Sequence, residues 1–594
     1  MKRLVIICLA VVCGVMLHAA SYGVLVNGKM YYAASYEGAD PFGGGYEQYL
    51  AHVQVKSGDY CQLYDLSNSA AWAVQLDDAS VTGFTINGDR YNVSVTGCYD
   101  FYIKLKYQSD RLYIGAGSNC GEGQDISGGV TPGGDPVTPQ DYASAVPSQC
   151  TDVLLQAFYW NSHSDNTYGG SRWTTLKSQA SEISSYFDLV WLPPSCTAND
   201  QMGYLPNHYS YQDCKMGSGS ELNQLISALH QGGTRVIADI VINHAGNKSS
   251  WVDFYDEDFG SYGHFYPQST WITSDDEAKG RGQLGSNADD GQESNRNYDS
   301  ARDWDHKNSD VQAMCKAYLK WMKNAMQYDG FRFDYCGGYH VSHVRDYVKE
   351  AKPYFSVMEY WNGDANVLKS RIDDASKGTL TFDFALYYNA LQKGIAKGSY
   401  SGCVKAGLRG KGYAKYAVLF ADNHDTFARD INDDVGGSRD GKTTINNRDL
   451  MLQCNAYILS MPGVPCVFWP HWYKYKSEIK KMIQARKAAG IHSESVISEQ
   501  SGSGWYKATV NGKNGSVVLY LGTAASDAAP EGYEKAIKEG KVAMYYSATK
   551  QAVENVQQSA VSHQQSAEKF MKDGKLYIRR GEKVFDVTGR AVGH

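Results

Sequence analysis

Charged and hydrogen-bonding side chains stand where several apolar segments in the middle of the chain end. These ends are Asp239-Ile240-Val241-Ile242-Asn243-His244, Arg332-Phe333-Asp334, Val357-Met358-Glu359 and Asp422-Asn423-His424-Asp425. If the segments are strands of one parallel barrel, their ends lie at the rim that carries the active site in such barrels. Three carboxylates, Asp334, Glu359 and Asp425, would then meet there with two imidazoles and a guanidinium.

A ring of carboxylates suits the hydrolysis of glycosidic bonds. A retaining mechanism needs a nucleophile and an acid/base whose carboxyl groups are about 5–5.5 Å apart. A nearby arginine favours the ionised nucleophile, whereas partial burial and neighbouring negative charge favour the protonated acid. A further carboxylate can stabilise the positive charge that develops on the sugar.

The elements that must position these groups follow from the apolar pattern. Between residues 150 and 485, eight apolar segments alternate with segments of helical character, which predicts an α/β fold with a parallel (β/α)8 TIM barrel. The predicted strands are Val153–Phe158, Leu189–Pro194, Val236–Ile242, Gly330–Asp334, Phe355–Glu359, Leu380–Phe384, Ala417–Ala421 and Val464–Trp469. Lys307–Tyr328 has the spacing of an amphipathic helix.

A long polar insertion follows the third predicted strand. Residues 245–328 separate His244 from Asp329, and only their last part is needed for a helix. The Asp- and Gly-rich remainder, residues 245–305, is predicted to be a subdomain that protrudes from the barrel, because loops of this length are usually functional.

Segments with strand patterns flank the barrel. Residues 21–117 predict a β-sandwich-like domain, and residues 118–149 predict a linker rich in Gly, Pro, Ser and Thr. Residues 486–549 predict a C-terminal all-β domain, and residues 550–594 predict a linker followed by a short hairpin over Lys575–Val592.

Composition excludes several classes of protein. The 594 residues are 43% hydrophobic and 20% charged, which is typical of globular domains. A net charge of −7 argues against a nucleic-acid partner. No apolar stretch is long enough to predict a membrane span. The 45 tyrosines suit sugar ligands, but they also suit ordinary β-rich cores.

The N-terminus has the features of a secretory signal peptide, residues 1–20, in which Lys2 and Arg3 precede an apolar run. We therefore expect a protein that is secreted or held at the cell surface or in the periplasm.

Removing Cys8 and Cys13 from the 13 cysteines leaves 11, an odd number. For the remaining cysteines we consider two pairings, with buried free thiols as the alternative. The pairings are Cys61 with Cys98 and Cys196 with Cys214.

The strand-end motifs, in this order, resemble the α-amylase family of retaining glycoside hydrolases over residues 150–545. Five further motifs are similar to the plant and archaeal type of that family. They are Val190-Trp191-Leu192-Pro193-Pro194, Gly203-Tyr204-Leu205-Pro206, Asp303-Trp304-Asp305-His306, Gly463-Val464-Pro465 and Gly490-Ile491-His492-Ser493. Nine motifs in register make the resemblance specific.

The resemblance implies a role for each residue. Asp334 would be the nucleophile, Glu359 the general acid and base, and Asp425 the carboxylate that holds substrate hydroxyls and stabilises the transition state. Arg332 would keep Asp334 ionised. The remaining substrate-binding residues would contact the sugar at the cleavage position, by hydrogen bonds from two histidines and by stacking of a tyrosine. They are His244, His424 and Tyr204.

Taken singly, each residue has a structural alternative. Asp334 and Arg332 could form an ion pair at the rim, because structural networks also perturb carboxylates. Glu359 could be a solvated charge, and Asp425 could cap a helix. The two histidines and the tyrosine could be packing residues.

The resemblance also implies Ca²⁺, which takes six to eight oxygen ligands. Asn243, Asp303 and the Gly338 carbonyl would be ligands that join the barrel to the protruding subdomain. A further ligand would come from the acidic stretch Asp289, Asp290 and Glu293, and we assign Glu293. In one departure from the family, Gly337 stands where a basic residue usually contacts sugar on the leaving-group side.

The N-terminal β domain is a candidate starch-binding module, with a structural sandwich as the alternative. Its candidate aromatic platforms are Tyr46, Tyr49, Trp72 and Tyr102. A tethered module would raise the effective concentration of the enzyme at a polymer. The segment Lys575–Val592 resembles C-terminal tails that some Gram-negative bacteria use as secretion signals.

These observations predict a secreted, calcium-dependent, monomeric α-amylase that hydrolyses internal α-1,4 bonds of starch, glycogen or malto-oligosaccharides. One alternative within the family is a debranching enzyme or 4-α-glucanotransferase. An alternative from another class is a non-catalytic glucan-binding protein on a decayed barrel, which the intact carboxylates disfavour.

Overall fold

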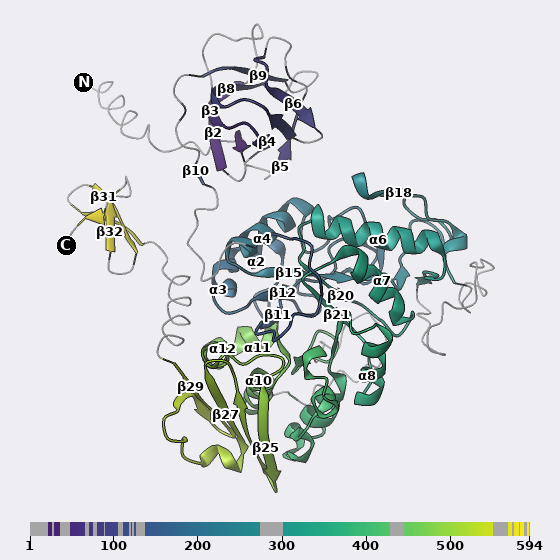
Figure 1. Cartoon of the computed structure of the whole chain (residues 1–594), viewed down its shortest axis with the longest axis vertical. Helices are drawn as coiled ribbons and strands as arrows, with labels where there is room; N and C mark the ends of the chain where they lie inside the picture. The colour runs from purple at the N-terminus through teal and green to yellow at the C-terminus, as the bar shows by residue number, and fades with distance from the viewer. Residues whose placement is uncertain are drawn as a thin grey trace. The chain divides into compact units, whose positions relative to one another are not determined.

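The computed structural model describes residues 22–125 with short gaps, 137–273, 301–427, 445–549 except residue 446, and the strands between residues 568 and 592 (Figure 1). The chain divides into two compact units, residues 1–129 and residues 130–594.

The first unit is an antiparallel β domain, as predicted. Its strands are β1 (Tyr22–Val26), β2 (Lys29–Ser35), β3 (Gln48–Val55), β4 (Tyr60–Asp65), β5 (Ala70–Trp72), β6 (Phe84–Asn87), β7 (Arg90–Val93), β8 (Gly97–Lys104), β9 (Arg111–Ala116) and β10 (Gln124–Asp125). The sheet runs β6-β7-β4-β1-β2-β3-β8-β9, with β5 paired to β4 and β10 paired to β2. Alternate side chains from both halves of the sheet, such as Val24, Leu63, Val53 and Phe101, share one core.

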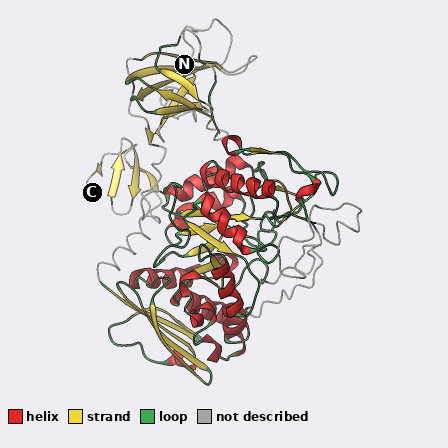
Figure 2. Cartoon of the chain, turned by 45° about the vertical axis from the view of Figure 1, so that its right-hand side comes forward, coloured by secondary structure: helices red, strands yellow, loops and turns green. Residues whose placement is uncertain are grey.

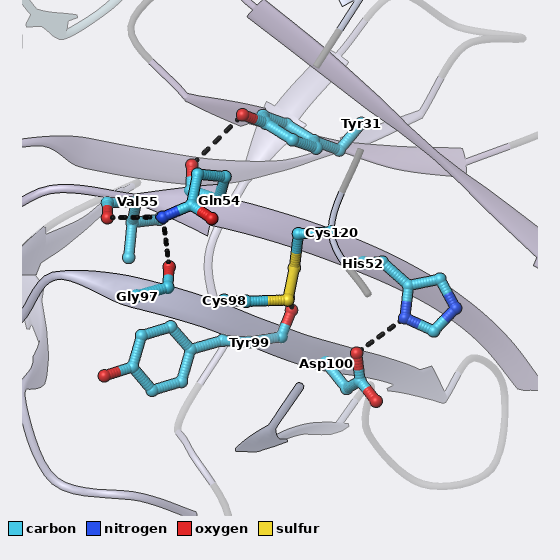
Figure 3. Close-up of a disulfide and its surroundings, with 9 residues drawn as sticks. All are labelled: Tyr31, His52, Gln54, Val55, Gly97, Cys98, Tyr99, Asp100 and Cys120. Atoms are coloured by element: carbon cyan, nitrogen blue, oxygen red, sulfur yellow. Dashed lines mark hydrogen bonds and ion pairs between the residues drawn. A yellow bond between two sulfur atoms is a disulfide. The ribbon is translucent and has the colours of Figure 1, made fainter. Parts of the chain in front are cut away.

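A disulfide joins Cys98 at the start of β8 to Cys120 beyond β9 (Figure 3). The predicted pairing of Cys98 with Cys61 is wrong, because Cys61 lies in the core on β4 and three strands separate β4 from β8 in the sheet. The pairing of Cys196 with Cys214 is also wrong, since both are free thiols. Hydrogen bonds from Ser195 to Gln212 and from Thr197 to the Asp213 carbonyl already tie their two segments together.

The second unit contains the predicted barrel, which is closed and parallel. Its strands are β11 (Leu154–Gln156), β12 (Leu189–Trp191), β15 (Arg235–Ile240), β20 (Gly330–Phe333), β21 (Phe355–Met358), β22 (Leu380–Phe382), β23 (Ala417–Phe420) and β24 (Val464–Phe468), each paired with the next and β24 with β11. Each strand lies within its predicted segment or overlaps it almost fully. Asp239 and Arg332 are paired within the ladder, whereas Asp334 and Glu359 lie just beyond the ends of β20 and β21 and begin the following loops.

Helices surround the barrel strands (Figure 2). They are α2 (Trp173–Ser178), α3 (Ala180–Ser184), α4 (Gly219–Gln231), α6 (Ser309–Asn324), α7 (Val341–Ala351), α8 (Ala365–Asp374), α9 (Phe384–Leu386), α10 (Arg448–Ser460), α11 (Trp469–Lys474) and α12 (Lys476–Ala489). Shorter helical turns are η1 (Gly260–Tyr262), η2 (Ser269–Trp271), η3 (Tyr387–Gln392), η4 (Ile395–Lys397), η5 (Ser401–Cys403), η6 (Gly407–Lys411), η7 (Ala414–Tyr416) and η8 (Thr523–Ser526). The predicted helix is α6, in which Val311, Met314 and Tyr318 are buried. None of the described helices is long and apolar enough to cross a membrane.

Two insertions extend the active-site rim. After β12, the pair β13 (Thr197–Ala198) and β14 (Pro206–His208) brackets the loop that carries Tyr204. After β15, the protruding segment contains β16 (His244–Ala245), β17 (Glu257–Asp258), β18 (His264–Phe265) and β19 (Arg302–Asp303). The buried Arg302 guanidinium donates to the carbonyls of Ser250, Trp251 and Asp253 and thereby holds the segment together. Residues 274–300 lie outside the described part of the chain.

The C-terminal all-β domain is confirmed as a five-stranded antiparallel sheet in the order β25-β26-β27-β29-β28. Its strands are β25 (Val496–Gly502), β26 (Trp505–Asn511), β27 (Gly515–Gly522), β28 (Glu534–Glu539) and β29 (Val542–Ala548). In place of the single hairpin expected near the C-terminus there are four antiparallel strands, β30 (Glu568–Lys572), β31 (Lys575–Arg580), β32 (Lys583–Asp586) and β33 (Ala591–Val592).

Candidate active site

One arginine connects the acidic residues at the carboxyl ends of three neighbouring strands. Arg332, at the end of β20, is 1% exposed. Its Nη1 donates to Asp239 Oδ1 and to Asp334 Oδ1, each at 2.7 Å. Its Nη2 lies 2.6 Å from Glu359 Oε1, beyond the end of β21. Asp334 and Glu359, which the sequence analysis brings together, therefore contact the same guanidinium.

Asp239 also belongs to this cluster, although it was not among the predicted site residues. It lies opposite Arg332 in the ladder between β15 and β20. Its Oδ2 accepts hydrogen bonds from Trp191 Nε1 at 3.0 Å and from the Tyr204 hydroxyl at 2.9 Å. The signal in the sequence was a carboxylate inside an otherwise apolar strand, because a buried carboxylate needs a paired cation or several donors.

Burial and mutual repulsion raise the pKa values of the carboxyl groups. Burial, followed by the charges of Asp239 and Asp425, raises the pKa of Asp334 to about 6, although Arg332 opposes the change. Burial, followed by the charges of Asp334 and Asp425, raises the pKa of Glu359 to about 7, again against Arg332. One guanidinium cannot neutralise four carboxylates, so the cluster favours a proton. Of Asp334 and Glu359, it is Glu359 that holds a proton to the higher pH.

The two oxygens of Glu359 have different surroundings. Oε2 accepts a hydrogen bond from the backbone N–H of Tyr335 at 3.0 Å. Oε1 has no hydrogen-bond partner among the described residues, because the nearby Arg332 Nη2 does not direct an N–H at it. Tyr335 has a φ of 47°, in the left-handed region that bulky residues rarely adopt. Such backbone strain gathers at functional sites, and here it aims an amide at Glu359.

Asp425, the third predicted carboxylate, follows β23 on the same rim. Its Oδ2 lies 3.3 Å from His424 Nε2, and its side chain is 10% exposed. The amide of Gln156, at the end of β11, lies 2.9 Å from His424 Nδ1. Because an amide nitrogen only donates, Nδ1 accepts, and Nε2 is the nitrogen that carries a proton toward Asp425.

The two remaining predicted sugar ligands contact each other. His244 Nε2 lies 2.8 Å from the Tyr204 carbonyl oxygen and donates to it, while Nδ1 faces the Asn243 amide at 3.2 Å. Burial lowers the pKa of His244 to about 4, so the ring is neutral. In this arrangement His244 holds the Tyr204 loop, and its contact with a sugar stays a prediction.

Three nearly parallel rings lie together beside the carboxylates. The Tyr204 and His424 rings are 5.2 Å apart, and Trp160 lies 5.8 Å from Tyr204 and 6.1 Å from His424. All three interplanar angles are 13° or less. Trp160, in the loop after β11, was not among the predicted residues. In the sequence, Trp160 is recognisable only as a tryptophan soon after the first apolar strand. The closed barrel is what brings it next to Tyr204.

Three of the four predicted calcium ligands also meet. Asn243 Nδ2 donates to Asp303 Oδ1 at 3.0 Å, between segments that pair as β16 and β19. A Cβ at Gly338 would lie 2.0 Å from Asn243 Oδ1, so only a glycine fits beside this oxygen. Such oxygen donors from three segments fit Ca²⁺. Glu293 lies outside the described residues, among which there is no group of three or more His, Cys, Asp or Glu placed to hold a metal.

Comparison with known proteins identifies similar sequences among the alpha-amylases. The family model of the alpha-amylase catalytic domain matches residues 186–396. A protein named "Probable alpha-amylase 2" from Arabidopsis thaliana is 30% identical over 373 residues, which cover 58% of this chain and 82% of that protein. "Glucan 1,4-alpha-maltotetraohydrolase" from Stutzerimonas stutzeri is 28% identical over 404 residues, covering 62% of this chain and 68% of that protein.

A solved structure is similar in fold. The gamma-CGTase from alkalophilic Bacillus clarkii superposes with a TM-score of 0.50 at 15% identity, covering 69% of this chain and 71% of that one.

The arginine cluster leads to a prediction about stability. Replacing Arg332 by Met leaves the carboxylates buried without a cation, so we expect the free energy of unfolding to fall by about 3–5 kcal/mol. The folded pKa values of Asp334 and Glu359 already lie above their ordinary values and should rise further. A carboxyl group with a raised folded pKa destabilises the protein as pH rises from its unfolded pKa toward its folded pKa.

The loss in Arg332→Met should therefore be larger at about pH 8 than at about pH 5, measured by denaturant unfolding. Arg486→Met is the matched control, because the buried Arg486 donates to the backbone carbonyls of Leu459, Met461 and Gly463. Its loss of stability should be alike at both pH values. A loss in Arg332→Met that does not depend on pH would contradict the account of the cluster.

Proposed function

Because the chain belongs to the α-amylase family and is a glycoside hydrolase of the α-amylase type, we propose that it cleaves internal α-1,4-glucosidic bonds of starch- or glycogen-type glucans with retention of anomeric configuration. The observation that carries the proposal is the contact of two carboxyl groups, Asp334 and Glu359, with one buried guanidinium at the barrel rim. Two carboxyl groups side by side are what a retaining glycosidase requires.

The reaction follows from the two environments. Asp334, whose Oδ1 is bound to Arg332, attacks the anomeric carbon while Glu359 gives its proton to the departing glycosidic oxygen. A covalent glycosyl-enzyme results. Glu359 then removes a proton from water, which attacks the same carbon and releases Asp334 as a carboxylate.

The substrate is held by the groups around this pair. Asp425, next to the Nε2 proton of His424, accepts hydrogen bonds from sugar hydroxyls and stabilises positive charge on the ring. The parallel rings of Trp160 and Tyr204 provide a surface for the apolar face of the sugar. The glycine at position 337 leaves the leaving-group side without a basic contact from that position.

The disulfide supports our proposal that the chain is exported, because disulfides persist in oxidising compartments. The expected signal peptide, residues 1–20, lies outside the described part of the chain.

Asp334→Asn tests the function. The change removes the nucleophile without altering shape, so we expect release of reducing sugar from amylose to fall by at least about 10⁴-fold with the melting temperature retained. Asp346→Asn, an exposed carboxyl group on α7, is the control that should keep full activity.

Product analysis separates the alternatives. Long-chain products from amylose support endo-acting hydrolysis. Cleavage of the α-1,6 linkages in pullulan, or cyclic or lengthened products, would indicate a debranching enzyme or glucanotransferase. Binding of starch by the wild type without sugar release would indicate the non-catalytic alternative.

The pH dependence of kcat/KM follows from the raised pKa values. Activity needs Asp334 ionised and Glu359 protonated, so the rate should fall below about pH 6 and above about pH 7. Asp239→Asn removes a charge that raises the pKa of Asp334. The fall of kcat/KM on the acidic side, which we call the acidic limb, should therefore move to lower pH. Glu257→Gln changes a buried carboxyl group that binds the amides of Tyr209 and Ser210, and should leave the limb in place. An acidic limb that is the same in Asp239→Asn would contradict the assignment.

We also propose that Asn243, Asp303 and the Gly338 carbonyl bind Ca²⁺, with Glu293 as a further ligand. The ion would join the barrel to the protruding segment and would take no part in the chemical steps. A chelator should lower the melting temperature, since a ligand at 100 times its Kd stabilises the native state by about 2.7 kcal/mol.

Two variants test whether the effect of the chelator on the melting temperature comes from this site. Asp303→Asn should abolish it, whereas Asp253→Asn, an exposed carboxylate that binds the Ser249 and Ser250 amides in the same segment, should preserve it. A wild-type melting temperature that a chelator does not change would refute the site.

A further inference from the structure

The outer face of one half of the N-terminal sheet combines aromatic and charged side chains. Strands β3, β8 and β9 are consecutive antiparallel neighbours. Side chains alternate along them, and the inward set is fully buried in the core. The inward residues are Ala51, Val53, Phe101, Ile103, Leu112 and Ile114. Part of the opposite set forms what we call the outer β3-β8-β9 face, which we define as Leu50, His52, Asp100, Tyr102, Tyr113 and Gly115.

Two tyrosine rings lie next to each other on this face. Tyr102 and Tyr113 are direct partners in the β8–β9 ladder, with ring centroids 5.7 Å apart and planes inclined by 48°. Both side chains are half-buried. Gly115 follows on β9, and a Cβ there would lie 3.2 Å from the Tyr113 ring and 3.8 Å from the Tyr102 ring. The glycine therefore leaves the edge of the tyrosine pair uncovered by a side chain at that position.

An imidazole and a carboxylate that contact each other stand beside the rings. His52 Nδ1 and Asp100 Oδ1 are 2.6 Å apart on neighbouring strands, and the His52 side chain is 49% exposed (Figure 3). Asp100 lies opposite Gly115 and two residues from Tyr102. Two residues along an antiparallel strand span about 6.8 Å, so the carboxylate lies close to the tyrosine pair.

Rings that offer an apolar surface next to a carboxylate and an imidazole suit a ligand with apolar ring faces and many hydroxyl groups. We propose that the outer β3-β8-β9 face is a second carbohydrate-binding site that takes an α-glucan chain independently of the barrel. The identity of the polymer rests on the proposed function. The site keeps the enzyme on its substrate, because two linked sites raise each other's effective concentration.

The face includes one of the aromatic residues expected to bind starch and adds another. Tyr102 belongs to it, and Tyr113 was not predicted. Tyr49 instead packs against the core, edge-on to Tyr22 at 4.7 Å. Tyr46 and the side chain of Trp72 lie outside the described part of the chain.

The test uses the full chain carrying Asp334→Asn, so that no substrate is consumed. Adding Tyr102→Ala and Tyr113→Ala together should weaken binding to granular starch by about tenfold or more. Calorimetry of maltoheptaose binding should detect two sites in the Asp334→Asn parent and one site in the variant that also lacks the two tyrosines. Tyr60→Ala is the control, because Tyr60 is 39% exposed on β4 of the same unit and should leave both measurements unchanged.

A second variant guards against misfolding of the double variant. His52→Ala changes an exposed side chain and should also weaken granule binding. Granule binding by both variants equal to that of the Asp334→Asn parent would overturn the second site, as would preference for cellulose over starch. Hydrolysis of soluble malto-oligosaccharides by the wild type is measured separately. Failure of that activity would overturn the proposed function instead.

Discussion

The active site depends on a single buried cation placed among carboxylates. Arg332 contacts Asp239, Asp334 and Glu359, and it lies over the Trp191 ring with its Cζ 4.9 Å from the centroid. A carboxylate removed from water needs a cation or several donors, and one guanidinium cannot serve every carboxylate fully. The excess negative charge therefore raises the affinity of the cluster for a proton. This constraint raises the pKa of Glu359 above that of Asp334, so the two neighbouring carboxyl groups differ in their affinity for a proton.

The barrel supplies the geometry that this constraint requires. Asp239 and Arg332 are register partners on adjacent strands, and Glu359 follows the next strand. The rigid ladder fixes these groups, while the loops beyond it refine the arrangement. The positive φ of Tyr335 places an amide on Glu359. Strain of this kind persists only where the surrounding structure imposes it. Here it accompanies the hydrogen bond from the Tyr335 amide to Glu359.

The groups around the centre are organised by contacts between loops. His244 binds the Tyr204 carbonyl, and the Tyr204 hydroxyl in turn binds Asp239. The protruding segment is joined to the barrel where Asn243 meets Asp303. The Tyr204 ring, the arginine cluster and the proposed calcium ligands thus form a continuous set of contacts.

The sequence by itself determined what depends on local pattern. Apolar segments separated by helical spacing indicated all eight barrel strands, and the polar residues at their ends indicated Asp334 and Glu359. Tertiary structure alone decided which distant groups share a contact. Asp239 became part of the site through its register with Arg332, Trp160 through closure of the barrel, and Cys120 as the partner of Cys98. The physical reason is that side-chain period reports the face on which a residue lies, whereas partners are set by register, closure and loop path, which no local pattern encodes.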